Sequence, residues 1–319
     1  MTEAIVIGLS AVVMAIRDGQ AVVLTLRPTG QAASLPFGPF DPQGDRTFEL
    51  ALRSFVTAQT RFELGYVEQL YTFGDKGRDA PLAHLGGATG PEASRVISVG
   101  YLGLTPHAVD THAPDSAWAD WLRFFPWEDW RQGRPPALAA LEPALRDWAT
   151  GDLARLARAR LLFALDDASW NEERVMERYE LLYEAGLAPE AARDRGEHPD
   201  PTVAQLGTAL GEPMISDHRR ILATGLSRLR GKLKYRPVIF EVMPDDFTLS
   251  ALQRAVEAVA GIPLHKQNFR RALERAELVE GLGRVDQETG GRPAELFRFR
   301  REILGARAVS GLALPLLRE

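Results

Sequence analysis

The chain is 319 residues long, with 45% hydrophobic and 25% charged residues, so it is long enough to bury the cores of two or more domains. It has no apolar run of the length that a membrane span needs, and it has no cysteine, which excludes disulfides and thiolate metal sites. The N-terminus reads as a strand rather than a secretion signal, so we expect a cytoplasmic protein with no membrane partner.

The net charge of −5 is unevenly distributed along the chain. Residues 213–319 carry 19 Lys and Arg against 13 Asp and Glu, a net of +6, whereas residues 1–212 carry 19 against 30, a net of −11. A basic C-terminal part on an acidic body indicates an anionic partner that meets one end only.

The first part of the chain predicts strands around a single helix. Alternating residues at 4–28 predict two strands joined by a turn of the hairpin kind, and apolar spacing after Thr47 predicts a helix. Further strands are expected at 66–73 and 95–104, followed by an aromatic segment at 118–130 that we expect in the core and an interface. This order predicts an α+β or α/β/α domain that ends near residue 133.

The middle of the chain is predicted to be helical. Leucine-rich spacing runs through residues 136–200, a polar stretch with two prolines at 193–201 predicts a loop, and a further helix is expected from about Ser216 to Leu233.

The last part predicts a compact helix, helix and hairpin unit. YRPVIFEVM (235–243) is rich in β-formers, and the next helix has Thr248 as its expected N-cap and Gly261 as its stop. A second helix, PLHKQNFRRALERAEL, precedes two strands, LVEGLGRV and AELFRFR. This order is typical of a winged helix-turn-helix.

Burial of Phe269, Leu273 and Ala276 would turn a basic and amide-bearing face of the second helix outward. Such side chains suit phosphates, guanine edges and adenine edges in a major groove, and the hairpin adds two arginines. The alternative is an ordinary solvated face. The residues that we expect to meet DNA are Lys266, Gln267, Asn268, Arg270, Arg271, Arg284 and Arg292.

Residues 35–65 resemble the Nudix box, a loop and helix whose glutamates bind the divalent ions that bridge a pyrophosphate. Gly38 and Arg53 fit that pattern. The expected glutamates fall on uncharged residues, namely Ser54, Val56 and Thr57. We therefore expect no metal and no catalytic residue. The alternative is a Nudix pyrophosphatase with displaced ligands, drawn from Asp41, Asp45 and Glu49.

Further motifs are similar to the NadQ/NrtR-type family, which comprises Nudix-related transcriptional regulators of NAD metabolism, and the NadQ branch is most similar. The motifs are VEQLYTFG (67–74), RVISVGYLGL (95–104), RFFPWEDW (123–130), the stretch 217–274 and GGRPAELFRF (290–299). The helical segment 134–212 is a departure from ordinary members. It is expected to pack against its own core or a partner.

The resemblance implies a fold class and a division of the chain. The fold would be α+β, with a Nudix-like α/β/α sandwich, a helical insertion and a C-terminal winged helix-turn-helix. The expected boundaries are a sensing domain at 1–133, the insertion at 134–212, a linker helix at 213–234 and the winged helix at 235–319.

The resemblance also implies a function. The protein would be a homodimeric repressor of NAD biosynthesis genes that binds a palindromic operator and responds to NAD, ADP-ribose or ATP, with no other cofactor. A third possibility is a nucleotide-binding module without DNA contact.

Two more groups of residues follow from the resemblance. Lys232 and Lys234 of the linker would meet phosphates of the DNA backbone. The nucleotide would be held by residues on strands or loops that line a Nudix cleft, for which core packing of the rings and surface ion pairs of the arginines are the alternatives. These residues are Arg27, Phe37, Phe73, Arg78 and Tyr101.

Overall fold

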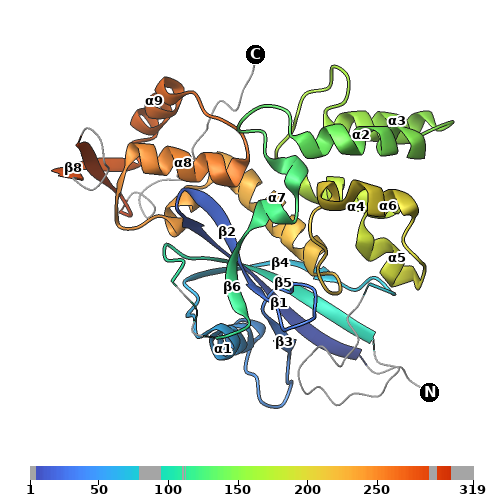
Figure 1. The fold of residues 1–319 in the computed structure, drawn as a ribbon. Coiled ribbons are helices and arrows are strands. Elements are labelled where there is room, and N and C mark those ends of the chain that lie inside the picture. Colours follow the sequence, from blue (N-terminus) through green and yellow to red (C-terminus); the bar gives the residue numbers. More distant parts are fainter. Residues whose placement is uncertain (1–4, 79–94, 110, 112, 287–292, 303–319) are drawn as a thin grey trace.

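The computed structural model describes residues 5–78, 95–109, 111, 113–286 and 293–302. Figure 1 shows a twisted sheet with helices packed on it, the winged helix at one side of the molecule and the helices of the middle segment at the opposite side. No helix within these ranges is long and apolar enough to cross a membrane. The elements are β1 (Ile5–Arg17), β2 (Gln20–Leu26), β3 (Phe37–Pro39), α1 (Phe48–Thr60), β4 (Tyr66–Phe73), β5 (Arg95–Leu104), β6 (Ser116–Asp120), α2 (Pro136–Trp148), α3 (Leu153–Phe163), α4 (Val175–Glu184), α5 (Pro189–Arg195), α6 (Pro201–Leu206), α7 (His218–Tyr235), β7 (Asp246–Thr248), α8 (Leu249–Ala260), α9 (Lys266–Ala276), β8 (Val279–Asp286) and β9 (Ala294–Phe299).

The main sheet has the order β4-β5-β1-β2-β6, with β3 added to β1. Strands β1 and β5 run parallel, from Ile5 beside Arg95 to Met14 beside Leu104, while β1 and β2 form an antiparallel hairpin. The hairpin turn has two central residues with positive φ, Asp18 at 52° and Gly19 at 73°. That combination matches the twist of paired strands, and it confirms the predicted hairpin.

Helix α1 covers one face of the sheet. The Thr47 hydroxyl accepts a hydrogen bond from the Leu50 amide at 3.2 Å and begins the helix, as the sequence predicts. Leu52 and Val56 are fully buried on that face, together with Leu9 and Val13 of the sheet.

Helix α7 lies on the other face, where it packs against β1, β4 and β5, and α4 of the middle segment packs against α7. The aromatic segment belongs to the apolar cluster on this side of the sheet, and its core role is confirmed because Trp121, Phe124, Phe125 and Trp127 are all fully buried. One apolar cluster runs without interruption from the sheet through α7 to the winged helix. The predicted α+β fold class is confirmed.

The winged helix is built as predicted around α8 and α9. The Thr248 hydroxyl caps α8 by accepting from the Ala251 amide at 3.1 Å, and α8 ends at Gly261, whose φ is 72°. A Cβ at Gly261 would lie 2.4 Å from the Glu128 carbonyl oxygen, so both the backbone conformation and the space require glycine.

The segment before α8 corrects one prediction. Val238–Val242 forms a 3-10 helix rather than a strand. Its apolar side chains are buried on several sides, and a short apolar run of this kind does not distinguish a strand from a buried helical turn. The third strand of the small sheet is β7, which pairs with β9 through Phe247 and Phe297.

Candidate functional site

The second helix of the winged helix, α9, presents the face that its sequence predicts. Phe269 and Leu273 are buried under the helix. The predicted DNA-contacting residues on its other side are all exposed, and they are Lys266, Gln267, Asn268, Arg270 and Arg271.

Among the described residues, three cations of α9 differ from most arginines in that no partner is seen for them. Within the part of the chain that the structure describes, Lys266, Arg270 and Arg271 form no hydrogen bond or ion pair. Elsewhere, arginines such as Arg53 and Arg158 are held by nearby glutamates. Unpaired cations on one exposed helix face can neutralise phosphates without first breaking an internal ion pair.

The predicted wing residues have different positions. Arg284 lies on β8, and its guanidinium forms a 2.6 Å ion pair with Asp246 of β7 while its side chain stays largely exposed. Arg292 lies outside the described residues.

The two linker lysines are engaged inside the protein. Lys232 is nearly buried, forms an ion pair with Glu68 and donates to the Tyr66 hydroxyl at 3.2 Å. Burial opposes its charge, but the hydrogen bonds to Glu68 and Tyr66 outweigh burial and raise the Lys232 pKa. Lys234 forms ion pairs with two glutamates that precede α4, Glu172 and Glu173. In this structure neither ammonium is free to meet a phosphate.

Helix α1 of the Nudix-like domain carries no carboxylate on the outward positions that follow Arg53. Ser54, Thr57 and Ala58 face solvent, whereas Val56, which the sequence comparison placed at a glutamate position, is fully buried in the core. The solvent-facing positions of α1 that follow Arg53 therefore include residue 58 and do not include residue 56.

Arg53 itself has a structural task in the Nudix-like domain. Its guanidinium pairs with Glu49 at 2.9 Å and donates to the carbonyls of Leu64 and Gly65, so it fastens α1 to the loop before β4.

The three aromatic ligand candidates do not line one cleft. Phe73 and Tyr101 are both buried, but on opposite faces of the sheet. Burial raises the pKa of the Tyr101 hydroxyl. Phe37 is partly buried, and its ring meets His218 of α7 edge-on with 4.8 Å between centroids.

The two arginine candidates both reach the middle helical segment. Arg27 pairs with Glu212 at 2.5 Å. Arg78 forms two hydrogen bonds to the Glu180 carboxylate, at 2.8 and 3.2 Å, and lies 3.5 Å from the centre of the Tyr183 ring. Both arginines are thus engaged in ion pairs here, Arg27 with a half-exposed side chain and Arg78 with a largely buried one, and their role in ligand binding stays a prediction.

A buried ion cluster at the centre of the molecule was not predicted. Both oxygens of the Glu128 carboxylate accept from Arg178 of α4, at 2.5 and 2.8 Å, and one also accepts from Arg230 of α7 at 2.6 Å. Arg230 donates in addition to the carbonyl of Val259 in α8. All three charged side chains are fully buried. Spacing in the sequence gives no signal for such a cluster because Glu128 and Arg230 are 102 residues apart.

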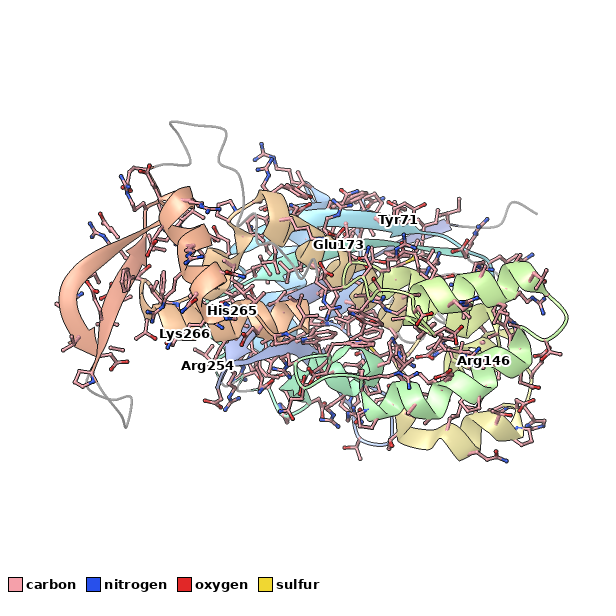
Figure 2. The ribbon with its side chains drawn as sticks, turned by 90° about the horizontal axis from the view of Figure 1, so that it is seen from above. Tyr71, Arg146, Glu173, Arg254, His265 and Lys266 are labelled. Atoms are coloured by element: carbon pink, nitrogen blue, oxygen red, sulfur yellow. The ribbon has the colours of Figure 1, made fainter. Side chains whose placement is uncertain are left out.

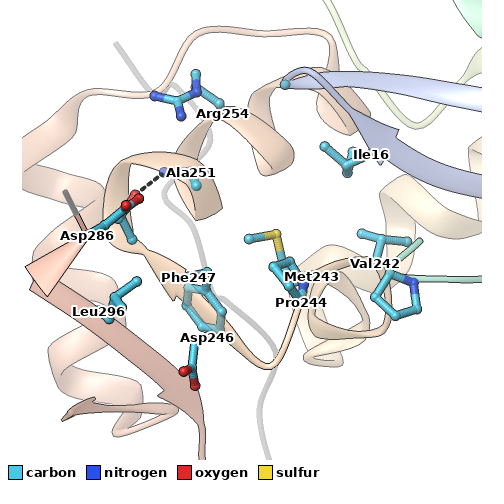
Figure 3. Close-up of a pocket in the computed structure, with 13 residues that line it drawn as sticks. Ile16, Val242, Met243, Pro244, Asp246, Phe247, Ala251, Arg254, Asp286 and Leu296 are labelled. Atoms are coloured by element: carbon cyan, nitrogen blue, oxygen red, sulfur yellow. Dashed lines mark hydrogen bonds between the residues drawn. The ribbon is translucent and has the colours of Figure 1, made fainter. Parts of the chain in front are cut away.

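A pocket of 290 Å³ lies where the β1–β2 hairpin meets the winged helix (Figure 3). Its apolar lining includes Ile16, Met243, Phe247 and Leu296, and Arg254 of α8 lies at its rim. The pocket marks a seam between the Nudix-like domain and the winged helix.

Comparison with known proteins identifies the C-terminal part. Residues 239–299 match the family model of the NrtR DNA-binding winged helix domain. The chain is also 36% identical over 96 residues to the ADPR responsive transcriptional repressor NtrR of Acinetobacter baylyi. This match covers 30% of the chain and 37% of the length of that relative.

Solved structures share the fold over almost the whole chain. NrtR of Shewanella oneidensis superposes with a TM-score of 0.52 at 20% identity, covering 92% of this chain and 94% of that one. A MutT/nudix family protein of Enterococcus faecalis superposes with a TM-score of 0.53 at 13% identity, covering 94% and 88%. Residues 239–299 thus match an NrtR DNA-binding winged helix domain, and the chain shares with NrtR the fold in which such a domain follows a Nudix-like domain.

Proposed function

We propose that this chain is a transcriptional repressor that binds operator DNA through α9 and the β8–β9 wing. The observation that carries the proposal is the exposed face of α9, where Lys266, Arg270 and Arg271 have no partner among the described residues. This face belongs to a domain that matches a DNA-binding family, and unpaired arginines and lysines of this kind suit both phosphates and guanine edges.

The Nudix-like domain is proposed to bind the effector, and ADP-ribose is the first candidate. The name of the Acinetobacter relative describes it as responsive to ADPR and as a transcriptional repressor. NAD and ATP share the adenine nucleotide part of that molecule and are the comparison ligands. Binding of the effector is proposed to change the affinity for the operator, because a ligand that binds one conformation of the chain more tightly shifts the population toward that conformation.

The effector is proposed to be bound without being hydrolysed. The positions that face outward after Arg53 on α1 hold Ser54, Thr57 and Ala58, none of which can contribute negative charge to a magnesium site. A sensor with this helix keeps its ligand intact and responds to its concentration.

A homodimer on a palindromic operator is the proposed assembly. Two copies related by a two-fold axis would place two α9 helices in successive major grooves, and each half-site would read the same sequence.

The DNA proposal is tested by fluorescence anisotropy with palindromic fragments from the promoters of NAD biosynthesis genes. The wild-type protein is expected to bind one such fragment more tightly than a scrambled fragment of equal length. Arg270→Ala is expected to weaken specific binding by about 1–3 kcal/mol. Arg46→Ala removes an exposed arginine next to α1 and serves as the control with unchanged affinity. Equal affinity for both fragments, or an unaffected Arg270→Ala variant, would contradict the proposal.

The effector proposal is tested on the same complex. Addition of ADP-ribose is expected to shift the binding curve at concentrations where NAD or ATP acts less. The same samples, incubated with Mg²⁺ and separated by chromatography, should contain unchanged ADP-ribose. Release of AMP at a rate that scales with protein would instead favour the pyrophosphatase alternative.

A further inference from the structure

Arg254 lies on α8, the helix that precedes α9, and is exposed. It forms no hydrogen bond or ion pair with any residue in the described ranges. The opposite side of α8 is buried through Leu252, Ala255 and Val256, so the fold directs Arg254 outward. Figure 2 shows Arg254 at the same end of the molecule as His265 and Lys266, which begin α9.

This position matters because of how a helix-turn-helix docks on DNA. The second helix enters the major groove, and the first helix crosses the sugar-phosphate backbone beside it. An unpaired guanidinium on the outer side of the first helix is suited to a phosphate oxygen, which it can bind through two parallel N–H groups.

Arg254 also touches the Nudix-like domain. A Cβ at Gly19, in the turn between β1 and β2, would lie 3.6 Å from the Arg254 Nε and 3.7 Å from its Cδ. Figure 3 shows the guanidinium at the rim of the seam pocket, on the side away from Met243 and Val242. The side chain of Arg254 therefore runs along the hairpin turn from its Cβ to its Nε, and it remains exposed to solvent.

The acidic side chains near Arg254 interact with other groups, so the Arg254 guanidinium is available to bind a phosphate. Asp246 lines the same pocket but is paired with Arg284 at 2.6 Å. Glu257, one turn further along α8, accepts from the Gln253 side chain and from the Leu264 amide, each at 2.9 Å. Asp286 also lines the pocket and has an interaction of its own.

We propose that Arg254 contacts the phosphate backbone of the bound DNA and that the β1–β2 turn of the Nudix-like domain sets its position. The proposal rests on the proposed function as a DNA-binding repressor. It adds a contact outside α9 and the wing, and it makes one element of the sensing domain a support for a DNA-binding side chain.

The phosphate contact is tested by the salt dependence of DNA binding in the full chain. Each phosphate neutralised contributes about 0.9 to the slope of log K against log salt. Arg254→Gln is expected to reduce the slope by about 1 and to weaken binding about three- to tenfold at ~0.1 M salt, equally for palindromic and scrambled fragments. The control Arg46→Gln removes the same charge at an exposed position just before α1 of the Nudix-like domain and should leave the slope unchanged.

The role of the turn is tested with two asparagine variants, since asparagine tolerates positive φ. Gly19→Asn places new atoms against Arg254, whereas Gly30→Asn has the same kind of backbone, with φ of 78°, and nothing within 4 Å. Gly19→Asn is expected to weaken DNA binding severalfold in the wild-type background and to have no effect in the Arg254→Gln background. Gly30→Asn should have no effect in either.

The outcomes separate this inference from the proposed function. A wild-type protein that shows no preference for the palindromic fragment contradicts the proposed function itself. Specific binding with an unchanged slope for Arg254→Gln overturns the phosphate contact alone. Equal losses from Gly19→Asn in both backgrounds overturn the support by the turn, and matching thermal unfolding of all variants excludes misfolding as the cause.

Discussion

Asp217 lies at the start of α7, where a carboxylate is almost completely buried. It occupies the N-cap position, but its side chain makes no capping bond and instead accepts from Arg220 at 3.1 Å. Burial raises the pKa of Asp217 from 3.8 to about 6, and the positive charges of Arg220 and Arg78 only partly oppose this. The nearby carboxylate of Glu180 acts in the same direction as burial.

This pKa predicts a specific pH dependence of stability. Below the unfolded-state value of 3.8 the folded and unfolded chains both hold the proton, and the protonated group costs nothing in ionisation. Between pH 3.8 and about 6 the unfolded chain loses this proton while the folded chain keeps it, so the folded state loses stability, by on the order of 3 kcal/mol once the pH exceeds about 6. Asp217→Asn stays neutral, so its stability relative to wild type should rise by about that amount between pH 4 and pH 7.

The measurement is urea unfolding of both proteins across this pH range. Asp245→Asn removes an exposed carboxylate that has no partner among the described residues, and its difference from wild type should stay constant with pH. A constant difference for Asp217→Asn as well would mean that the buried carboxyl group does not control this titration.

At the level of elements, the strands and helices whose apolar residues follow one clear period could be predicted from the sequence. Strands β4 and β5 have the expected bounds, and α8 begins and ends at the expected cap residues, Thr248 and Gly261. Local periodicity and capping decide these elements. The 3-10 helix at Val238–Val242 was missed because its apolar run is buried from several directions.

The candidate site was predictable only where one element carries it. The outward face of α9 follows from helical spacing, whereas the state of Lys232 depends on Glu68, which lies 164 residues away in the chain. Arg78 is likewise engaged by Glu180, at a separation of 102 residues. Such pairs depend on how α7 and α4 pack on the sheet, and no local pattern encodes that packing.

The Glu128 cluster joins four elements, and within it the positive groups outnumber the carboxylate that they contact, while Glu172 acts on Arg230 more weakly. Two guanidinium groups, from Arg178 and Arg230, share one carboxylate in a fully buried site. Burial lowers the pKa of Arg230, and the attraction of Glu128 opposes that effect without cancelling it. Glu128 is therefore the charge on which the cluster depends.

Substitution of Glu128 and substitution of Arg178 should lower the free energy of unfolding by different amounts. Glu128→Gln keeps the shape but leaves two buried guanidinium groups without a counter-charge, and it is expected to destabilise the fold by about 3–5 kcal/mol. Arg178→Met leaves a neutral pair of Glu128 and Arg230, although the carbonyls of Leu162 and Asn171 lose a donor. It should therefore cost less, about 1–3 kcal/mol.

Chemical denaturation of both variants measures this difference, and the surface provides a matched control. Glu212 also pairs with two arginines, Arg27 and Arg123, but its side chain is 33% exposed. Glu212→Gln is expected to cost about 1 kcal/mol or less. If Arg178→Met lowered the free energy of unfolding more than Glu128→Gln, the excess positive charge would not be what determines the stability of the cluster.

For the molecule as a whole, the continuous core predicts that the Nudix-like domain and the winged helix unfold together. Helix α7 lies in that core, and its side chains Leu222, Leu226 and Leu229 are almost completely buried between the sheet and the helices around it. A chain with one core of this kind has no weakly packed boundary at which one part can open alone.

The residue composition allows the two parts to be followed separately. All six tryptophans lie between Trp118 and Trp170, so their fluorescence reports the central part of the molecule. The chain has no cysteine, so Glu274→Cys on the exposed side of α9 provides a single site for a fluorophore on the winged helix.

In urea the tryptophan and fluorophore signals are expected to give coincident transitions. Leu226→Ala should shift both midpoints together, by an amount equivalent to about 2–5 kcal/mol. A fluorophore transition with a lower urea midpoint than the tryptophan transition would show that α7 does not join the two domains into one cooperative unit. A fluorophore midpoint that Leu226→Ala leaves unchanged would show the same.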